Sequence, residues 1–533
     1  MKIDLFFEKF AGTSLTYDDV IFFPSYVDFP VDDVKLSSQL TREIRLNIPV
    51  VSSPMDTVTE ADLAIALALQ GGLGIIHYNM TPEQQLHQIQ KVKRFKNGSI
   101  FDPITLPPTA LISDVINIRR QQGYSIIPIT QDGKRHGKLV GMITKYDYSA
   151  FSDDSNNQRV SQRMVPLEQL TIATIEELSC QGVFDLNKAN DRLLDSHAAA
   201  LPIVDTNGCL CYLITRSDLE KHQNYPNAAV DNSKSLLVGA AVETWRGKAE
   251  ERIELIHKYV DVIVFDTAQG FSKYEIDLIR WTKSHYPNLQ VIGGNVVTAE
   301  GCEALIQAGA DALRIGMGSG SICTTQEVSG IGRGQASAVY ECAKVCRKAG
   351  IPILADGGIS KSSDIVKALG LGANVVMLGS LLACTSEAPG QTQIKDGVRL
   401  KEYRGMGSLK AMERGSATRY GTQNSLIRVP EGVTGLVPSR GSVSEWIPCL
   451  MQAVRQGLHK LGDSSVDALH ARVEQNQLKL ERRSEGAKRE GSVHSLYEVG
   501  TETVSAYRSG ISEKAITAQC RTTETNKEFA LIN

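Results

Sequence analysis

A glycine-rich loop around one cysteine is the segment of this chain best suited to covalent chemistry. The run R-I-G-M-G-S-G-S-I-C-T-T-Q-E-V, from Arg314 to Val328, places Cys323 among glycines and hydroxyl residues. A lone cysteine is more often a small buried hydrophobe than a nucleophile. Cys342 and Cys346 fit that description, because their spacing puts them on one face of a predicted helix. The neighbours of Cys323 favour an exposed thiol instead, so the loop indicates thiolate catalysis.

Two other glycine-containing segments have the composition of phosphate-binding loops. They read A-D-G-G-I, Ala355–Ile359, and L-G-S-L-L, Leu378–Leu382. Their glycines would present backbone N–H groups to an anion, with helix N-termini behind them. One such loop could merely let the chain turn. Two of them favour a phosphorylated ligand, which would then be the substrate of the cysteine.

The elements that must position these loops form a repeated pattern of strand and helix. Eight short apolar runs are predicted as parallel strands buried on both faces: Pro49–Met55, Gly74–Tyr78, Ser235–Val242, Asp261–Asp266, Leu289–Asn295, Ala312–Met317, Pro352–Asp356 and Asn374–Leu378. Eight such units favour an α/β fold of the (β/α)₈ TIM-barrel type over an open doubly wound sheet. In a barrel, active sites lie at the carboxyl ends of the strands, and the loops after strands seven and eight commonly hold phosphate. The two phosphate-type loops follow those strands.

The middle of the chain does not follow this pattern of strand and helix, and it contains an internal repeat. Ser125–Asp147 aligns with Ala200–Asp218, and each copy has two strands, a D-G or N-G turn and T-x-x-D before a predicted helix. The threonine and aspartate are explained by helix capping alone. The repeat also resembles a tandem CBS pair, a module whose threonine and aspartate contact a nucleotide ribose. Both interpretations stay open.

Composition and charge argue against several other classes of function. Lysine and arginine total 57 against 60 acidic residues, a net charge of -3, so no general positive field favours nucleic acid or an anionic membrane. The ten cysteines form no C-x-x-C pair, which argues against a structural metal. Neither a signal peptide nor an apolar run of membrane-spanning length is found, so we expect a cytoplasmic protein with reduced thiols.

The motifs together resemble the inosine monophosphate dehydrogenase family. The likeness covers the cysteine loop, A-D-G-G-I, S-S-P-M-D-T-V-T-E (Ser52–Glu60), G-G-N-V-V-T (Gly293–Thr298) and Y-R-G-M-G-S-L (Tyr403–Leu409), in family order. The resemblance implies NAD-dependent oxidation of IMP to XMP. Cys323 would add to purine C2, hydride would leave to NAD, and water would hydrolyse the covalent thioimidate.

The resemblance also implies roles for individual residues. The implied catalytic residues are Cys323, Thr325, Arg419 and Tyr420. The substrate would be bound by Ser53, Met55, Ser321, Asp356, Gly357, Gly358, Gly379, Ser380, Tyr403, Gly405, Met406, Gly407 and Glu431. NAD would lie near Asp266, Thr267, Asn295, Arg314, Gly316 and Gly318. A potassium ion would be held by Gly318, Gly320 and Cys323, with Glu490, Gly491 and Ser492 from a neighbouring subunit.

The dyad Arg419 and Tyr420 distinguishes between related functions. In the family this dyad activates the hydrolytic water, and GMP reductase, which shares the fold and the cysteine loop, lacks it. GMP reductase remains the enzymatic alternative. A nucleotide-sensing assembly protein with an inactive barrel is the alternative from another class. The resemblance further implies a homotetramer or an octamer, with a purine nucleotide regulator at the repeat.

These observations predict four regions. Residues 1–99 form an N-terminal arm and the first two βα units, and residues 100–233 form the inserted CBS pair. Residues 234–500 complete the barrel with a flap and the cation-binding segment. The polar tail, 501–533, is expected to be flexible or to act as an arm.

Overall fold

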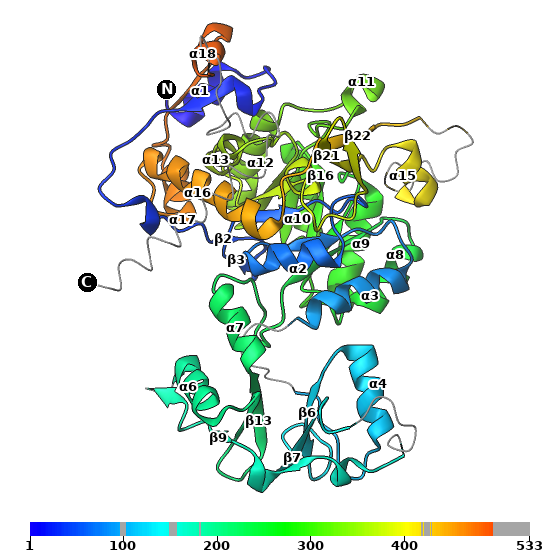
Figure 1. Ribbon diagram of the computed structural model, residues 1–533. Helices are drawn as coiled ribbons and strands as arrows, with labels where there is room; N and C mark the ends of the chain where they lie inside the picture. Colours follow the sequence, from blue (N-terminus) through cyan, green and yellow to red (C-terminus); the bar gives the residue numbers. More distant parts are fainter. Residues whose placement is uncertain are drawn as a thin grey trace. The chain divides into compact units, whose positions relative to one another are not determined.

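The chain folds into two compact units, each described here by itself (Figure 1). The computed structural model describes residues 1–95, 103–148, 157–180, 183–416, 419, 427 and 429–493. The first unit joins Met1–Val92 to the chain from Leu237 onward, and the second is Lys93–Leu236. The tail predicted at 501–533 lies outside the described residues.

Eight parallel strands form the centre of the first unit. In chain order they are β4 (Val50–Ser52), β5 (Gly74–Ile76), β14 (Val238–Val242), β15 (Val262–Phe265), β16 (Gln290–Val296), β17 (Ala312–Ile315), β18 (Ile353–Asp356) and β19 (Val375–Leu378). Each pairs with the next from β5 to β19, and β19 pairs with β4. Leu73 closes the ring, because its N–H donates to Val50 O and its carbonyl accepts from Ser52 N–H. The predicted barrel is confirmed, and the open sheet is wrong.

The helices of the barrel follow the strands as predicted. They are α2 (Ala61–Leu69), α3 (Pro82–Lys93), α8 (Lys248–Ile256), α9 (Lys273–His285), α10 (Ala299–Ala308), α12 (Gln335–Lys348) and α13 (Ser362–Gly370). Local capping starts two of them, since Ser272 accepts from Glu275 N–H and Thr298 accepts from Gly301 N–H. Cys342 and Cys346 are fully buried on α12, as predicted.

An antiparallel sheet that the sequence did not predict extends from the barrel. It consists of β20 (Thr392–Lys395), β21 (Val398–Arg404) and β22 (Thr434–Pro438). A buried ion pair anchors β21 to the loop after β4, because Arg404 Nη2 lies 2.6 Å from Asp56 Oδ2. The Arg404 N–H also donates to Thr57 Oγ1 at 3.0 Å. These contacts fix the end of β21, from which Tyr403 reaches the site described below.

The second unit contains the two hairpins expected from the repeat. In the first, β6 (Ile126–Thr130) pairs with β7 (Leu139–Thr144), and in the second, β12 (Ala200–Val204) pairs with β13 (Leu210–Thr215). The second copy has the expected cap, because Thr215 accepts from Asp218 N–H and α7 (Arg216–Asn224) follows. The identity of the unit as a CBS pair stays a prediction.

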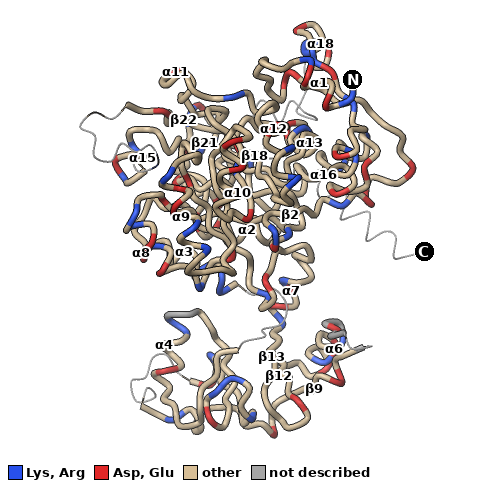
Figure 2. The backbone as a smooth tube through the Cα atoms, turned by 180° about the vertical axis from the view of Figure 1, so that it is seen from behind, with Lys and Arg blue, Asp and Glu red and all other residues tan. Residues whose placement is uncertain are grey.

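Charge and hydropathy add two observations. Acidic and basic residues are interspersed along the backbone in Figure 2, in keeping with a net charge of -3. Among the helices that the structure describes, none is both long and apolar enough to cross a membrane.

Candidate functional site

A cavity of about 270 Å³ opens at the carboxyl ends of the barrel strands. Its wall is formed by the segments after β4, β17, β18, β19 and β21. These are the segments in which the sequence motifs lie. The fold therefore brings the cysteine loop and both phosphate-type loops into one cavity, as a barrel requires.

Cys323 stands at the start of a continuous polar chain. Its Sγ lies 3.1 Å from Thr325 Oγ1, and the Thr325 hydroxyl donates to Glu431 Oε2 at 2.8 Å. The backbone supports this geometry, because Thr324 N–H donates to Glu431 O at 3.0 Å. A thiol proton can therefore move through one hydroxyl to a carboxylate, which leaves a thiolate nucleophile behind.

The two phosphate-type loops need glycine for different reasons. Gly357 and Gly358 have φ values of +92° and +72°, in the region that other residues rarely adopt. At Gly379 a Cβ atom would lie 2.5 Å from the Tyr403 hydroxyl. Burial raises the pKa of Tyr403 above its ordinary value, so the phenol keeps its proton and can donate it to an anion.

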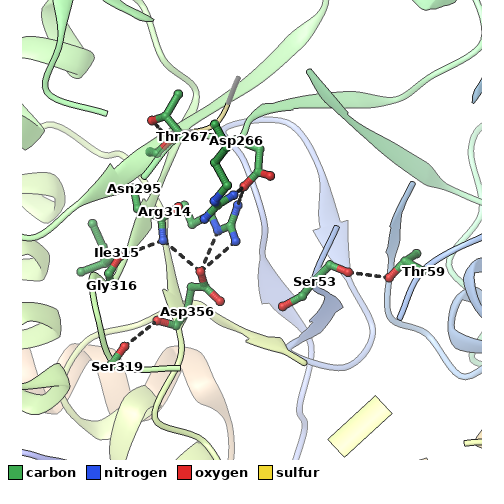
Figure 3. A network of polar contacts seen from close by, with 12 residues as sticks. Ser53, Thr59, Asp266, Thr267, Asn295, Arg314, Ile315, Gly316, Ser319 and Asp356 are labelled. Carbon is green, nitrogen blue, oxygen red and sulfur yellow. Dashed lines mark hydrogen bonds and ion pairs between the residues drawn. The ribbon is translucent and has the colours of Figure 1, made fainter. Parts of the chain in front are cut away.

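Charged and polar side chains form a network beside the cavity (Figure 3). Asp356 Oδ2 accepts from Asn295 Nδ2 and from Arg314 Nε, both at 2.9 Å. Arg314 also forms a buried ion pair with Asp266, and Arg419 pairs with the same Asp266 oxygen. Among the residues that the structure describes, Asp266 Oδ2 and Asn295 Oδ1 are buried and have no hydrogen-bond partner. Both oxygens are shielded, so a donor from a ligand could reach them only after a neighbouring side chain moves.

The cavity wall contains most of the predicted site residues. It includes the predicted catalytic residues Cys323, Thr325 and Arg419. It also includes every predicted substrate-binding residue, Ser53, Met55, Ser321, Asp356, Gly357, Gly358, Gly379, Ser380, Tyr403, Gly405, Met406, Gly407 and Glu431. Of the predicted NAD residues it includes Asn295, Arg314, Gly316 and Gly318. Asp266 and Thr267 lie behind the wall, in contact with those residues. Tyr420 lies outside the described residues.

The predicted cation ligands divide into two groups. Gly318, Gly320 and Cys323 line the cavity. Glu490 is the last residue of α18 (Glu485–Glu490), and Gly491 and Ser492 follow it. Figures 1 and 2 place α18 well away from α11 (Thr325–Ser329), which lies beside the cysteine loop. One chain alone therefore does not bring the six residues together.

Several residues that build the site were not predicted from the sequence. Gln335 Nε2 donates to Ile315 O at 2.8 Å and to Asp356 O at 3.0 Å, which ties β17 to β18. Ser319 contacts the Gln335 side chain at 3.2 Å. Glu275 is fully buried behind Thr267. A glutamine or glutamate at the start of a helix has no sequence signal that separates such anchors from surface residues.

Comparison with known proteins identifies one matching domain family and several similar sequences. The IMP dehydrogenase / GMP reductase domain matches residues 14–494. An inosine-5'-monophosphate dehydrogenase from Toxoplasma gondii is 42% identical, over 92% of this chain and 97% of the relative. One from Schizosaccharomyces pombe is 43% identical, over 92% and 93%.

A solved structure is also similar along the chain. It is a variant GMP reductase from Trypanosoma brucei in complex with guanosine 5'-monophosphate, with a TM-score of 0.75 and 34% identity. The alignment covers 91% of this chain and 98% of that one. A matching domain over most of the chain and relatives above 40% identity lead to one conclusion. This chain belongs to the IMP dehydrogenase / GMP reductase family.

Proposed function

We propose that this enzyme oxidises IMP to XMP through a covalent intermediate on Cys323, with NAD as the hydride acceptor. The observation that carries the proposal is the chain from Cys323 through Thr325 to Glu431, beside two glycine loops suited to a phosphate. The relatives named inosine-5'-monophosphate dehydrogenase, at 41–43% identity, support the same reaction.

The proposed chemistry has two steps. The Cys323 thiolate forms a bond to purine C2, and C2 loses a hydride, which leaves a thioimidate. Water then adds to C2, gives up a proton, and the C–S bond breaks to release XMP and the thiolate. NAD supplies the oxidising power by accepting the hydride of the first step. The residues of this chain generate the thiolate, hold the nucleotide and deprotonate the water.

The part of the cavity wall that contains Asn295 and Arg314, where NAD is expected, suits a ligand that carries hydrogen-bond donors. Among the described residues, Asn295 and Asp266 each have a buried oxygen without a hydrogen-bond partner, and an amide or hydroxyl donor that reached it after a side-chain movement would satisfy it. Arg419 occupies the same wall through its ion pair with Asp266. We therefore propose that Arg419 serves the hydrolytic step together with Tyr420, after the cofactor site has emptied.

The alternatives differ in what they require. GMP reductase is the activity named for the similar solved structure. By the family resemblance it shares the cysteine loop around Cys323 but lacks the dyad of Arg419 and Tyr420. Arg419 reaches the cavity wall here, which favours dehydrogenation. An inactive barrel that only senses nucleotides does not need Cys323 aligned with Thr325 and Glu431, and this alignment argues against it.

We also propose a potassium ion and an assembly of subunits. The carbonyls of Gly318 and Gly320 each accept one hydrogen bond within the chain and keep a second lone pair for a cation. Because α18 lies away from this loop, the other ligands would come from a second copy, in a homotetramer or octamer. A purine nucleotide bound to Lys93–Leu236 is the proposed regulator.

The experiment mixes purified protein with IMP, NAD and potassium and follows NADH by absorbance. We expect NADH and XMP in equal amounts from the parent. Cys323→Ser should lose turnover by more than about a thousandfold while still binding IMP, since an alcohol is far less ionised than a thiol. Consumption of NADPH with GMP, without NADH formation from IMP, would establish the reductase instead. Turnover by Cys323→Ser would exclude the covalent route.

A further inference from the structure

A closed ring of hydrogen bonds behind the active site involves one carboxyl group that the proposed chemistry does not use. Gly294 N–H donates to Glu275 Oε1 at 2.6 Å. Glu275 Oε2 lies 2.8 Å from Thr267 Oγ1, and Thr267 Oγ1 lies 3.0 Å from Gly294 O. The ring connects the start of α9, the segment after β15 and the end of β16.

The number of protons in this ring indicates whether Glu275 is protonated. The two oxygen–oxygen contacts, at 2.8 and 3.0 Å, each need one proton to be attractive. The Thr267 hydroxyl supplies one proton and the Gly294 carbonyl supplies none. The second must come from Glu275, on Oε2, because Oε1 already accepts from the Gly294 amide. With an ionised Glu275, one contact would bring two lone pairs together.

The surroundings of Glu275 favour the same neutral state. The side chain is fully buried. Ile279 of α9 and Leu305 of α10 pack beside it at Gly293. Arg314 of β17 is the charged group that acts on it among the described residues. Arg314 is already paired with Asp266, directly after β15, and with Asp356 of β18. Burial raises the pKa of Glu275 to about 8.

The ring controls a residue of the site. Asn295 follows Gly294 directly, its N–H donates to Thr267 O at 3.2 Å, and its amide donates to Asp356 Oδ2 at 2.9 Å. We propose that Glu275 acts as a neutral carboxylic acid and is a positioning residue, which holds Gly294 and Asn295 so that Asn295 keeps Asp356 in place for the substrate. Ionisation of Glu275 breaks the ring and loosens Asp356.

The first test measures thermal unfolding between about pH 5.5 and 8.5, and needs no enzymatic activity. Glu275→Gln reproduces both hydrogen bonds of the neutral acid at every pH, since its amide can donate to Thr267 and accept from Gly294. A carboxyl group whose folded pKa is raised stabilises the fold at low pH and loses that contribution as pH rises toward 8. The Tm of Glu275→Gln relative to the parent should therefore rise with pH, by roughly 3 °C in total.

The matched control is Glu303→Gln, the same change on the exposed face of α10. Its Tm difference from the parent should stay constant over the same pH range. Parallel curves for Glu275→Gln and the parent would overturn the neutral acid. Failure of Glu275→Gln to fold at pH 7 would overturn it too, because that result requires a carboxylate.

The second test rests on the proposed function and follows kcat/KM for IMP from pH 7 to 9. At pH 7 Glu275→Gln should stay within about twofold of the parent, and by pH 9 it should exceed the parent by about threefold or more. A constant ratio would remove the positioning role. If no protein makes NADH while the Tm curves diverge as expected, the proposed function fails and the neutral Glu275 stands.

Discussion

Asp266 is the residue at which both proposed steps meet. Its side chain is fully buried, and one of its oxygens contacts both Arg314 and Arg419. A ligand that takes over this carboxylate would release Arg419, and its departure would let Arg419 return. The two steps can thus share one wall of the cavity in turn.

Arg419→Ala tests this sequence of events. If Arg419 acts only on the water, hydride transfer proceeds normally and hydrolysis becomes slow. Rapid mixing with IMP and NAD should then give a burst of about one NADH per active site, followed by a slow steady phase. Arg414→Ala is the control, because Arg414 is exposed at the end of α15 (Leu409–Arg414) and does not line this cavity. Loss of the burst itself would assign Arg419 to binding or hydride transfer.

The sequence predicted residues that belong to contiguous motifs. Every predicted substrate-binding residue lines the cavity, because each stands in a glycine loop or at a strand end. Glu275 on α9 and Gln335 on α12 act through buried hydrogen bonds to backbone atoms of neighbouring strands. Those partners lie 19 and 20 positions away along the chain, and the packing of α9 and α12 on neighbouring strands brings them together. Their roles therefore depend on tertiary structure.

At the scale of elements, the buried strands were predicted from the sequence and the exposed strands were not. The barrel strands are buried on both faces, so each reads as an apolar run, and all eight were predicted. The sheet of β20, β21 and β22 has no such run, since all four residues of β20 and three of the five residues of β22 are exposed. Its position depends on the buried pair of Arg404 and Asp56 rather than on a hydrophobic pattern.

Gly74 offers a test of how closely one strand packs on its helix. A Cβ atom on this β5 residue would lie 2.4 Å from Ala64 Cβ and 2.5 Å from Ala64 Cα in α2. Gly74→Ala must push the helix backbone away, so we expect a loss of about 2 kcal/mol or more in the free energy of unfolding. Gly435→Ala in β22 is the matched control, because nothing lies within 4 Å of its Cβ position. Equal urea midpoints for the two variants would contradict this packing.

At the scale of the molecule, the second unit interrupts an ordinary βαβ crossover. Helix α3 follows β5, and β14, which resumes the barrel, pairs directly with β5. The two points at which the chain leaves and returns are adjacent, since Leu236 N–H donates to Phe95 O at 3.3 Å. Lys93 Nζ also lies 3.0 Å from Asp231 Oδ2. The barrel can therefore close its sheet without the residues between these points.

Deletion of residues 96–235, with a linker of about four glycine and serine residues in their place, tests that independence. The linker is long enough, because each extended residue spans roughly 3.3–3.6 Å and the joined ends are hydrogen-bonded neighbours. All cavity residues lie in the first unit, so kcat and KM for IMP should stay within about threefold of the parent. Any response of the parent rate to added purine nucleotides should disappear, since the proposed regulatory unit is gone. A deletion variant that melts cooperatively yet loses activity a hundredfold would show that the second unit shapes the active site, and a retained nucleotide response would place the regulator on the barrel.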